Sequence, residues 1–289
     1  MKVLVVGGSG FVGRALVSSL LGTGHEVEVW DRSPLAEGPG LRCRSVDLLG
    51  GQDLPLPEGR PWDAAFHLAA FSVPGMAWTH DLVMANLRMT ARVFDHLAGV
   101  AEGCRAIFAS SAFVYAPSAV PLRETDPLGA THPYALSKHL GETWALSLRD
   151  RLRVFIVRPF NQIGPGMPQG LLVPDLLDRI RSGETPIRMR GRDDLRDFLD
   201  WRDAMDAYLR LLEVDAPSGS IWNLCSGCPT RVSQLIAALL EAHGLDRPVT
   251  FADPAVESLL GDPSRLQAAT GWAPTRNLRD TAEAIAAVG

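Results

Sequence analysis

The fold of this chain is decided by its first thirteen residues, MKVLVVGGSGFVG (1–13). A run of β-branched and aliphatic residues predicts a strand over 2–6, and glycines spaced by two residues follow it at once, before a helix predicted over 11–22. In this setting glycine lets the backbone turn tightly and approach a pyrophosphate, whose charge the N–H groups at the helix N-terminus can meet. The expected contacts are Gly7, Gly10, Phe11, Val12 and Gly13. The spacing is G-x-x-G-x-x-G, and a glycine triplet taken alone also fits a plain tight turn.

The rest of the first half alternates short β-branched runs with longer stretches of helical periodicity, which is typical of parallel βαβ units. We expect further strands over 26–30, 42–46, 63–67, 105–109 and 153–158, and helices over 80–98 and 133–150. After Arg158 the pattern is broken by prolines and glycines. The later segments are expected as helices over 171–182, 202–213, 232–243 and 278–288 and as strands over 186–190 and 220–224.

The prediction is therefore an α/β fold, a Rossmann-type doubly wound parallel sheet with a smaller C-terminal substrate lobe. Residues 1–158, with returning segments near 186–224, form the dinucleotide-binding part, and the smaller lobe lies within 159–289. The crevice between them, at the carboxyl ends of the strands, is the expected ligand site.

Composition excludes several classes of protein. With 46% hydrophobic and 21% charged residues the 289-residue chain can bury a large core, and 28 basic against 33 acidic residues give a formal net charge of -5. Such a balance offers no bulk attraction to a nucleic acid or an anionic membrane, so neither is expected as a partner. No run of eighteen apolar residues occurs. The four cysteines are too few and too scattered for a disulfide framework, so a reducing compartment, by default the cytoplasm, is expected.

Residues at two strand ends bear on which dinucleotide binds. Asp31 closes the second expected strand, where a carboxylate can accept both ribose hydroxyls of NAD and repel a 2′-phosphate. Arg32 beside it can instead pair with a 2′-phosphate, so NAD is expected, with NADP as the alternative. Asp47 and Leu48, at the end of the third strand, are candidate adenine contacts. Each of these positions also fits the ordinary start of a turn.

Tyr134 and Lys138 form the candidate catalytic pair. They lie four residues apart in PYALSK (133–138), at the start of a helix signalled by its proline, and positions i and i+4 share one helix face. Because the chain has three tyrosines and only two lysines, chance explains the pair poorly. A free tyrosine has a pKa of about 10, and a neighbouring ammonium can help to lower it for proton transfer near neutrality. The alternative is a solvated pair on a surface helix.

Taken together, these residues resemble the extended short-chain dehydrogenase/reductases that act on nucleotide sugars, the NAD-dependent epimerase/dehydratase family. The resemblance rests, in chain order, on residues 7–13, Asp31, HLAA (67–70), SSAFVY (110–115), Tyr134 with Lys138, and RPFNQIGPG (158–166). It implies that Ser111 holds the reacting oxygen of the sugar while Tyr134 passes the proton. It implies cofactor contacts from Leu68, Ala69, Ala70, Tyr134 and Lys138, and substrate contacts from Ser72, Ser111, Ala112, Phe113, Asn161 and Val173. For Ser111 alone, a strand-end turn is the alternative.

The residues after Ser111 help to separate the reactions of this family. Its 4,6-dehydratases carry an Asp-Glu pair directly after the catalytic Ser or Thr, because removing water needs a further acid and base. Ala112 and Phe113 stand there instead, so dehydration is not expected. A nucleotide-sugar 4-ketoreductase and a 4-epimerase both remain. A cofactor-binding protein without catalysis is a third interpretation.

The C-terminal half is most similar to the GDP-4-keto-6-deoxy-mannose reductases. LRDFLDWRDA (195–204) and IWNLCSG (221–227) are similar to segments of that group, which implies that Arg196 reaches the substrate pyrophosphate. This favours a 4-ketoreductase for a GDP-linked 4-keto-6-deoxy sugar. FADPAVESLLGD (251–262) departs from the group, whose members carry an Arg-Pro-x-Asp/Glu segment there that helps to grip the nucleotide. The identity of the base therefore stays open.

Two further expectations concern metals and assembly. Cys225 and Cys228 have the C-x-x-C spacing but no second pair accompanies them, so no metal site is expected. The resemblance implies a homodimer formed through the helices expected over 80–98 and 133–150. The side chains that could contribute are Leu87, Phe94, Leu140 and Trp144, for which packing in the core of one chain is the alternative.

Overall fold

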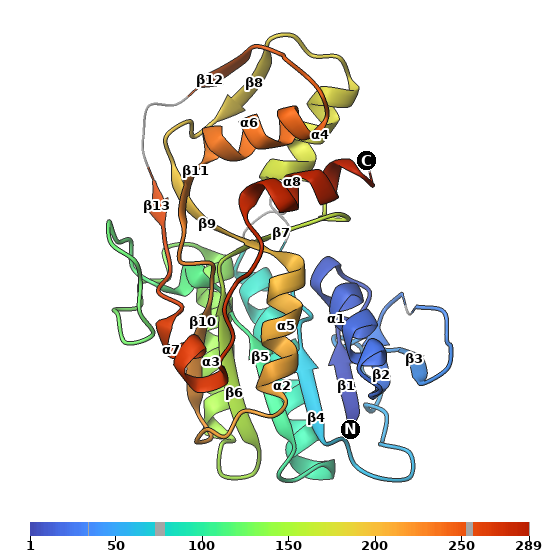
Figure 1. The fold of residues 1–289 in the computed structure, drawn as a ribbon. Coiled ribbons are helices and arrows are strands. Elements are labelled where there is room, and N and C mark those ends of the chain that lie inside the picture. Colours follow the sequence, from blue (N-terminus) through green and yellow to red (C-terminus); the bar gives the residue numbers. More distant parts are fainter. Residues whose placement is uncertain (34, 73–78, 253–256, 289) are drawn as a thin grey trace.

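A sheet of seven parallel strands lies at the centre of the computed structural model, which describes residues 1–33, 35–72, 79–252 and 257–288. The strands follow the order β10-β6-β5-β4-β1-β2-β3 (Figure 1). They are β1 (Lys2–Val6), β2 (Glu26–Asp31), β3 (Leu41–Ser45), β4 (Ala64–His67), β5 (Arg105–Ala109), β6 (Arg153–Pro159) and β10 (Ser220–Leu224). The predicted Rossmann-type sheet is confirmed, and each of its strands lies within a residue of the expected bounds.

Helices cover both faces of this sheet. Along β1, Val3 and Val5 pack toward α1 (Phe11–Gly22) and α5 (Trp201–Leu211), while Leu4 and Val6 pack toward α2 (His80–Val100) and α3 (Pro133–Ser147). Successive side chains of a strand point to opposite faces, so a strand that is covered on both sides has to be apolar at nearly every position. This explains why the first strand, after Lys2, is a continuous run of Val and Leu.

A smaller lobe lies beyond the carboxyl ends of the main strands (Figure 1). In it β9 (Leu195–Asp200) pairs with β7 (Asn161–Ile163), β11 (Pro229–Arg231) and β13 (Ser258–Leu259), and β8 (Ile187–Arg190) pairs with β12 (Val249–Ala252). The helices of this lobe are α4 (Leu172–Arg181), α6 (Val232–Ala242) and α8 (Leu278–Ala286). They enclose an apolar cluster of their own, which includes Leu176, Leu239 and Ile285.

The segments near 186–224 divide between the two parts of the molecule. The helix α5 packs against α1, and β10 joins the main sheet beside β6. In contrast, β8 and β9 pair only with strands of the smaller lobe. The short elements η1 (Ala112–Val114) and α7 (Ser264–Thr270) complete the list for the described residues.

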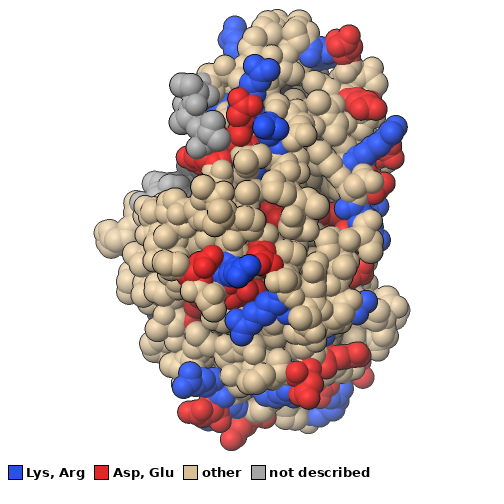
Figure 2. Space-filling view, turned by 60° about the vertical axis from the view of Figure 1, so that its left-hand side comes forward, with Lys and Arg blue, Asp and Glu red and all other residues tan. Residues whose placement is uncertain are grey.

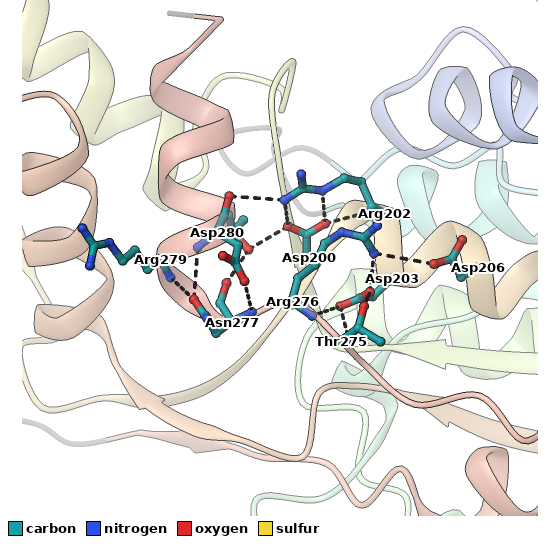
Figure 3. A network of polar contacts seen from close by, with 10 residues as sticks. Asp200, Arg202, Asp203, Asp206, Thr275, Arg276, Asn277, Arg279 and Asp280 are labelled. Carbon is teal, nitrogen blue, oxygen red and sulfur yellow. Dashed lines mark hydrogen bonds and ion pairs between the residues drawn. The ribbon is translucent and has the colours of Figure 1, made fainter.

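Two buried carboxylates at the start of α5 hold the C-terminal segment in place (Figure 3). Asp200 caps α5 by accepting from the backbone N–H of Arg202 at 2.8 Å, and it also accepts from the hydroxyl of Thr281 at 2.8 Å. Asp203 accepts from the N–H groups of Thr275 and Arg276 at 3.1 and 2.9 Å and pairs with the guanidinium of Arg276 at 2.5 Å. The chain that leads into α8 is thereby fixed to the junction of the two lobes.

The helices α2 and α3 pack against each other on one side of the sheet. Phe94 is fully buried in the core beneath them, so of the two alternatives for this residue the structure supports packing in the core of one chain. Trp144 is 40% exposed and donates its indole N–H to Asp95 at 3.0 Å. Met84 and Leu136 are also exposed on these two helices.

One face of the molecule shows how its surface charges are distributed. On the face shown in Figure 2, acidic and basic groups are intermixed and neither forms a broad area of its own. Within the described ranges, the helices include none that combines the length and the apolar character needed to cross a membrane.

Candidate active site

A cavity of about 590 Å³ lies at the carboxyl ends of the main strands, where the two lobes meet. Its walls come from the glycine turn after β1, the ends of β2 to β6, the start of α3 and the start of α4. The predicted site residues that line it are Gly7, Gly10, Phe11, Val12, Gly13, Asp31, Arg32, Asp47, Leu48, Leu68, Ala69, Ala70, Ser72, Ser111, Ala112, Phe113, Tyr134, Lys138, Asn161 and Val173. Arg196 does not line it.

The glycine turn forms a tight cradle at one end of the cavity. Gly7 has φ +88°, and a Cβ there would lie 2.6 Å from the backbone nitrogen of Ala69. A Cβ on Gly13 would lie 2.2 Å from the carbonyl oxygen of Gly7. Any larger residue would therefore push the strand and the helix apart, and the backbone N–H groups at the start of α1 stay close to the cavity.

An acidic side chain borders this cradle. Asp31 ends β2 and accepts from the backbone N–H of Ser9 at 3.1 Å. Arg32 follows it with its guanidinium 5.5 Å from the centre of the Phe71 ring. A glycine cradle with a carboxylate beside it fits a dinucleotide, whose pyrophosphate would face the turn and whose ribose hydroxyls would face Asp31. In the same region Asp47 accepts from the N–H of Leu49 at 3.0 Å, so it starts a turn as well as lining the cavity.

The candidate catalytic side chains come from α3 and from the end of β5. Pro133 is the first residue of α3, and the ring of His132 caps the helix by accepting from the N–H of Ala135 at 3.3 Å. Lys138 donates to the carbonyl oxygen of Ala109 at 2.7 Å, and its Nζ lies 5.9 Å from the centre of the Tyr134 ring. The fold therefore brings both members of the predicted pair to one place in the cavity wall.

Burial moves the pKa values of this pair in opposite directions. It raises the pKa of Tyr134 to about 12, against a hydrogen bond with the Ser111 hydroxyl that lowers it. Burial lowers the pKa of Lys138 to about 8, while the charge of Glu142 raises it. The expectation of a lowered tyrosine pKa is wrong, because desolvation of the phenolate outweighs its favourable contacts. Tyr134 therefore keeps its proton at neutral pH, which is the form that a general acid requires.

Two polar residues in the cavity wall were not expected from the sequence. Gln162 follows Asn161 directly, inside the segment that carried the family resemblance, so its position in that segment was a usable signal. Tyr208 lies on α5, and burial raises its pKa to about 12. It is one of only three tyrosines, but nothing nearby in the sequence marks it as a wall of the cavity.

Arg196 is held away from the cavity by two carboxylates. Its Nη2 lies 3.2 Å from Asp194 Oδ2 and 2.8 Å from Glu257 Oε2. Asn161, in contrast, lines the cavity and donates its side-chain amide to the carbonyl oxygen of Asp197 at 3.0 Å. Part of the segment 251–262, which departs from the reductase pattern, lies outside the described residues at 253–256. Among the described lining residues the cationic side chains are Arg32 and Lys138.

The described residues contain no group of three or more His, Cys, Asp and Glu side chains that could hold a metal ion. Cys225 is buried, and burial raises the pKa of its thiol well above the ordinary value. Cys228 is exposed.

Comparison with known proteins places the chain among enzymes. The model of the NAD dependent epimerase/dehydratase family matches residues 3–225. GDP-6-deoxy-D-mannose reductase of Pseudomonas aeruginosa is 30% identical over an alignment of 302 positions, which covers 98% of this chain and 95% of the relative. UDP-glucose 4-epimerase of Bacillus subtilis is 24% identical, with 97% of this chain and 94% of the relative covered.

Solved structures agree with this result. MoeE5 in complex with UDP-glucuronic acid and NAD has a TM-score of 0.87 and 27% identity, covering 98% of this chain and 97% of its own. RMD from Pseudomonas aeruginosa, complexed with NADPH, has a TM-score of 0.86 and 27% identity, covering 99% of this chain and 97% of its own. The resemblance drawn from the sequence and the expectation of an NAD-type cofactor are both confirmed.

Proposed function

The chain belongs to the NAD dependent epimerase/dehydratase family of extended short-chain dehydrogenase/reductases, and from this premise we propose that it is a nucleotide-sugar 4-ketoreductase. Its substrate in this proposal is an NDP-linked 4-keto-6-deoxy sugar, with GDP favoured as the nucleotide. The 30% identity with a GDP-6-deoxy-D-mannose reductase over nearly the whole of both chains supports this choice.

The reaction adds a hydride to the keto carbon and a proton to the keto oxygen. A reduced nicotinamide, when bound, supplies the hydride. Tyr134 donates its phenolic proton to the oxygen, and Ser111 donates a hydrogen bond to the same atom. The ammonium of Lys138, near the ring of Tyr134, stabilises the phenolate that forms. The glycine turn and Asp31 hold the dinucleotide, and the hydroxyl of Ser111 and the amide of Asn161 orient the sugar.

One observation favours reduction over dehydration. Ala112 and Phe113 follow Ser111 in the cavity wall, where a dehydratase needs a carboxylate pair. The acidic residues among the described cavity-lining residues are Asp31 and Asp47, and both belong to the dinucleotide end. The reacting end therefore offers Tyr134 for proton transfer but no second acid and base for the removal of water.

Cofactor consumption tests the proposal. Purified protein, incubated with NADH or NADPH and GDP-4-keto-6-deoxy-mannose, is expected to oxidise the cofactor as the keto sugar is reduced. The same assay with dTDP- and UDP-linked keto sugars measures the preference for the base. Failure to consume either cofactor with all three substrates would exclude the ketoreductase.

A 4-epimerase is the second candidate. Ser111, Tyr134 and Lys138 serve oxidation followed by re-reduction equally well, and a UDP-glucose 4-epimerase is similar to the chain over nearly its full length. An epimerase keeps its NAD and interconverts two sugars without net change of the cofactor. The absorbance spectrum of the purified protein and the balance of cofactor in the assay distinguish the two enzymes.

We also propose that the enzyme works as a homodimer in the cytoplasm. The exposed Met84, Leu136 and Trp144 lie on α2 and α3, the two helices expected to meet their copies in a partner subunit. Four free thiols, one of them exposed, suit a reducing compartment.

A further inference from the structure

The catalytic face of α3 continues one turn past Lys138. Tyr134, Lys138 and Glu142 follow one another at intervals of four residues, so they lie along one face of the helix. The first two line the cavity. Glu142 lies deeper, with only 3% of its surface exposed.

The carboxylate of Glu142 is paired on both oxygens. Oε1 accepts from the hydroxyl of Ser110 and from Nε of Arg158 at 2.9 Å, and Oε2 accepts from Nη2 of Arg158 at 2.7 Å. Arg158 is itself buried, lies over the ring of Tyr115 and donates to the carbonyl oxygen of Glu124 at 3.3 Å. A two-point pair of this kind keeps the carboxylate ionised and fixed in one orientation.

These contacts reach the strand end that carries Ser111. The carbonyl oxygen of Ala109 accepts from Lys138 at 2.7 Å, and the hydroxyl of Ser110 donates to Glu142. The hydroxyl of Ser111 forms a hydrogen bond with Tyr134. Three consecutive residues at the end of β5 are thus each fixed by one of the three residues on the face of α3. Loss of the middle contact removes the side-chain restraint on Ser110, whose backbone N–H still donates to the carbonyl oxygen of Val157 at 2.8 Å.

The charge of Glu142 also bears on Lys138. Burial lowers the pKa of Lys138 to about 8, and Glu142 is the neighbour whose charge raises it. The other groups facing Lys138 are neutral: burial and the charge of Lys138 lower the pKa of His67 on β4 to about 3, and the pKa of Tyr134 is about 12. From α2, Asn86 contributes an uncharged amide that donates to Ser137 at 2.9 Å. Arg158 on β6 is a cation that pairs with Glu142, and its charge acts on Lys138 in the direction opposite to that of Glu142.

We propose that Glu142 is a positioning residue of the proton transfer, which holds Ser110 and the strand end carrying Ser111 and places a fixed negative charge one helical turn past Lys138. The proposal rests on the proposed function, because Ser111 and Lys138 act in that reaction. Glu142 touches neither the cavity nor the reacting atoms, so it acts only through these two neighbours.

The two lysines of the chain make a direct test feasible. Protein labelled with isotopes at lysine gives two side-chain signals in NMR spectra, and a Lys2→Arg variant assigns them. In the wild type Lys138 is expected to titrate near pH 8. In Glu142→Gln, which keeps the shape but removes the charge, its pKa is expected to fall by about one unit or more. Glu142→Asp, which keeps the charge, is expected to restore most of the difference.

A matched control is provided by Glu28 on β2. It is also a buried carboxylate, and it accepts from Nε of Arg44 at 2.9 Å and from the indole N–H of Trp62 at 3.2 Å. Glu28→Gln is expected to leave the titration of Lys138 unchanged, which separates the charge of Glu142 from the general effect of removing a buried carboxylate. In the reduction assay, Glu142→Gln is expected to lower kcat more than it changes KM. The alkaline limb of its pH profile is expected to move to lower pH by as much as the pKa of Lys138 falls.

Because Glu142→Gln leaves Arg158 unpaired, the variant can fail to fold. The double variant Glu142→Gln/Arg158→Met removes both charges and avoids a buried lone cation. A lowered Lys138 pKa in folded Glu142→Gln supports the proposal, and in the double variant, which removes both charges, a lowered kcat with little change in KM supports it. An unchanged Lys138 pKa together with an unchanged pH profile overturns it. A lowered Lys138 pKa in protein whose wild type reduces no keto sugar would refute the proposed function and leave the control of Lys138 by Glu142 intact.

Discussion

Tyr134 and Lys138 lie on one face of the same helix, yet burial has opposite effects on them. The phenol of Tyr134 has a pKa of about 12 and is neutral at pH 7. The pKa of Lys138 is about 8, so its ammonium loses a proton at a lower pH than that of an ordinary lysine. Lys138 loses its charge as the pH rises through its lowered pKa. Lys138 is therefore the group that limits the reaction at alkaline pH. Reduction is expected to fall as pH rises past about 8, and kcat/KM measured from neutral to alkaline pH checks this. An alkaline limb that began only near the pKa of Tyr134 would contradict it.

Removing the phenolic hydroxyl tests the proton donor itself. Tyr134→Phe is expected to lower kcat for reduction by about 10²- to 10⁴-fold, because general acid catalysis contributes factors of that size. The binding of NADH, followed by fluorescence titration, is expected to stay nearly unchanged. A variant that kept most of its activity would show that another group supplies the proton.

Asp31 and Arg32 favour different cofactors: the carboxylate favours NAD and the guanidinium favours NADP. In Asp31→Ala the binding of NADH is expected to weaken by about 10-fold or more, since hydrogen bonds to a charged acceptor are lost. The binding of NADPH is expected to be unchanged or tighter, because the carboxylate no longer repels the 2′-phosphate. Dissociation constants of NADH and NADPH, measured for Asp31→Ala and for the complementary variant Arg32→Ala, show which of the two residues determines the preference for the cofactor. Equal losses for NADH and NADPH would mean that Asp31 does not discriminate.

Residues that lie in continuous motifs could be predicted, and residues defined by distant contacts could not. Ser111, Tyr134 and Lys138 reach the same cavity because each follows a strand or begins a helix of the predicted pattern. Arg196 carried an equally clear motif, but its two carboxylate partners include Glu257, which lies 61 residues further along the chain. No local pattern reveals such a partner, and Arg196, which is paired with it, does not line the cavity.

Among the helices and strands, the main sheet was predictable, whereas in the smaller sheets only β8 was expected. A strand that is covered by helices on both faces has a run of apolar residues in the sequence, as in β1, and such a run is a strong indication of a buried strand. The strands of the smaller lobe are short or mixed in character: β13 has two residues, β7 and β11 have three each, and β9 carries charged residues at three of its six positions. They form because β9 provides a shared partner for the other three, which is a property of the folded lobe.

The start of α5 fixes the C-terminal segment through Asp203, and this contact is expected to contribute substantially to stability (Figure 3). Asp203→Asn removes the buried charge that accepts from Arg276, which is itself 32% exposed, so the free energy of unfolding is expected to fall by about 1.5–3 kcal/mol. Asp206, whose carboxylate lies 3.6 Å from the same guanidinium but is 56% exposed, provides the matched control. Asp206→Asn is expected to change stability by less than about 0.5 kcal/mol. Denaturant unfolding of both variants measures the difference, and equal effects would mean that burial of Asp203 is unimportant.

For the whole molecule, the position of the cavity follows from the direction of the strands. All seven strands of the main sheet run parallel, so their carboxyl ends and the loops after them gather on one side. The smaller lobe closes over that side, and Asn161 and Val173 reach the cavity from its first segments. The place of the site could therefore be predicted from the sequence, whereas the residues of the smaller lobe that enter it depend on how that lobe folds.

The outer face of α2 and α3 decides whether the proposed dimer forms. In a monomer Met84, Leu136 and Trp144 stay exposed to water on two adjacent helices, which is unfavourable for apolar side chains. A second copy of the chain would bury them. Trp144→Arg places a charge on this face and keeps a partner for Asp95, so it is expected to convert dimers into monomers without unfolding the chain. Val120→Arg, at a residue that is 65% exposed outside these helices, is expected to remain dimeric. Sedimentation of the three proteins measures the oligomeric state, and a wild type that stays monomeric at high concentration would refute the dimer.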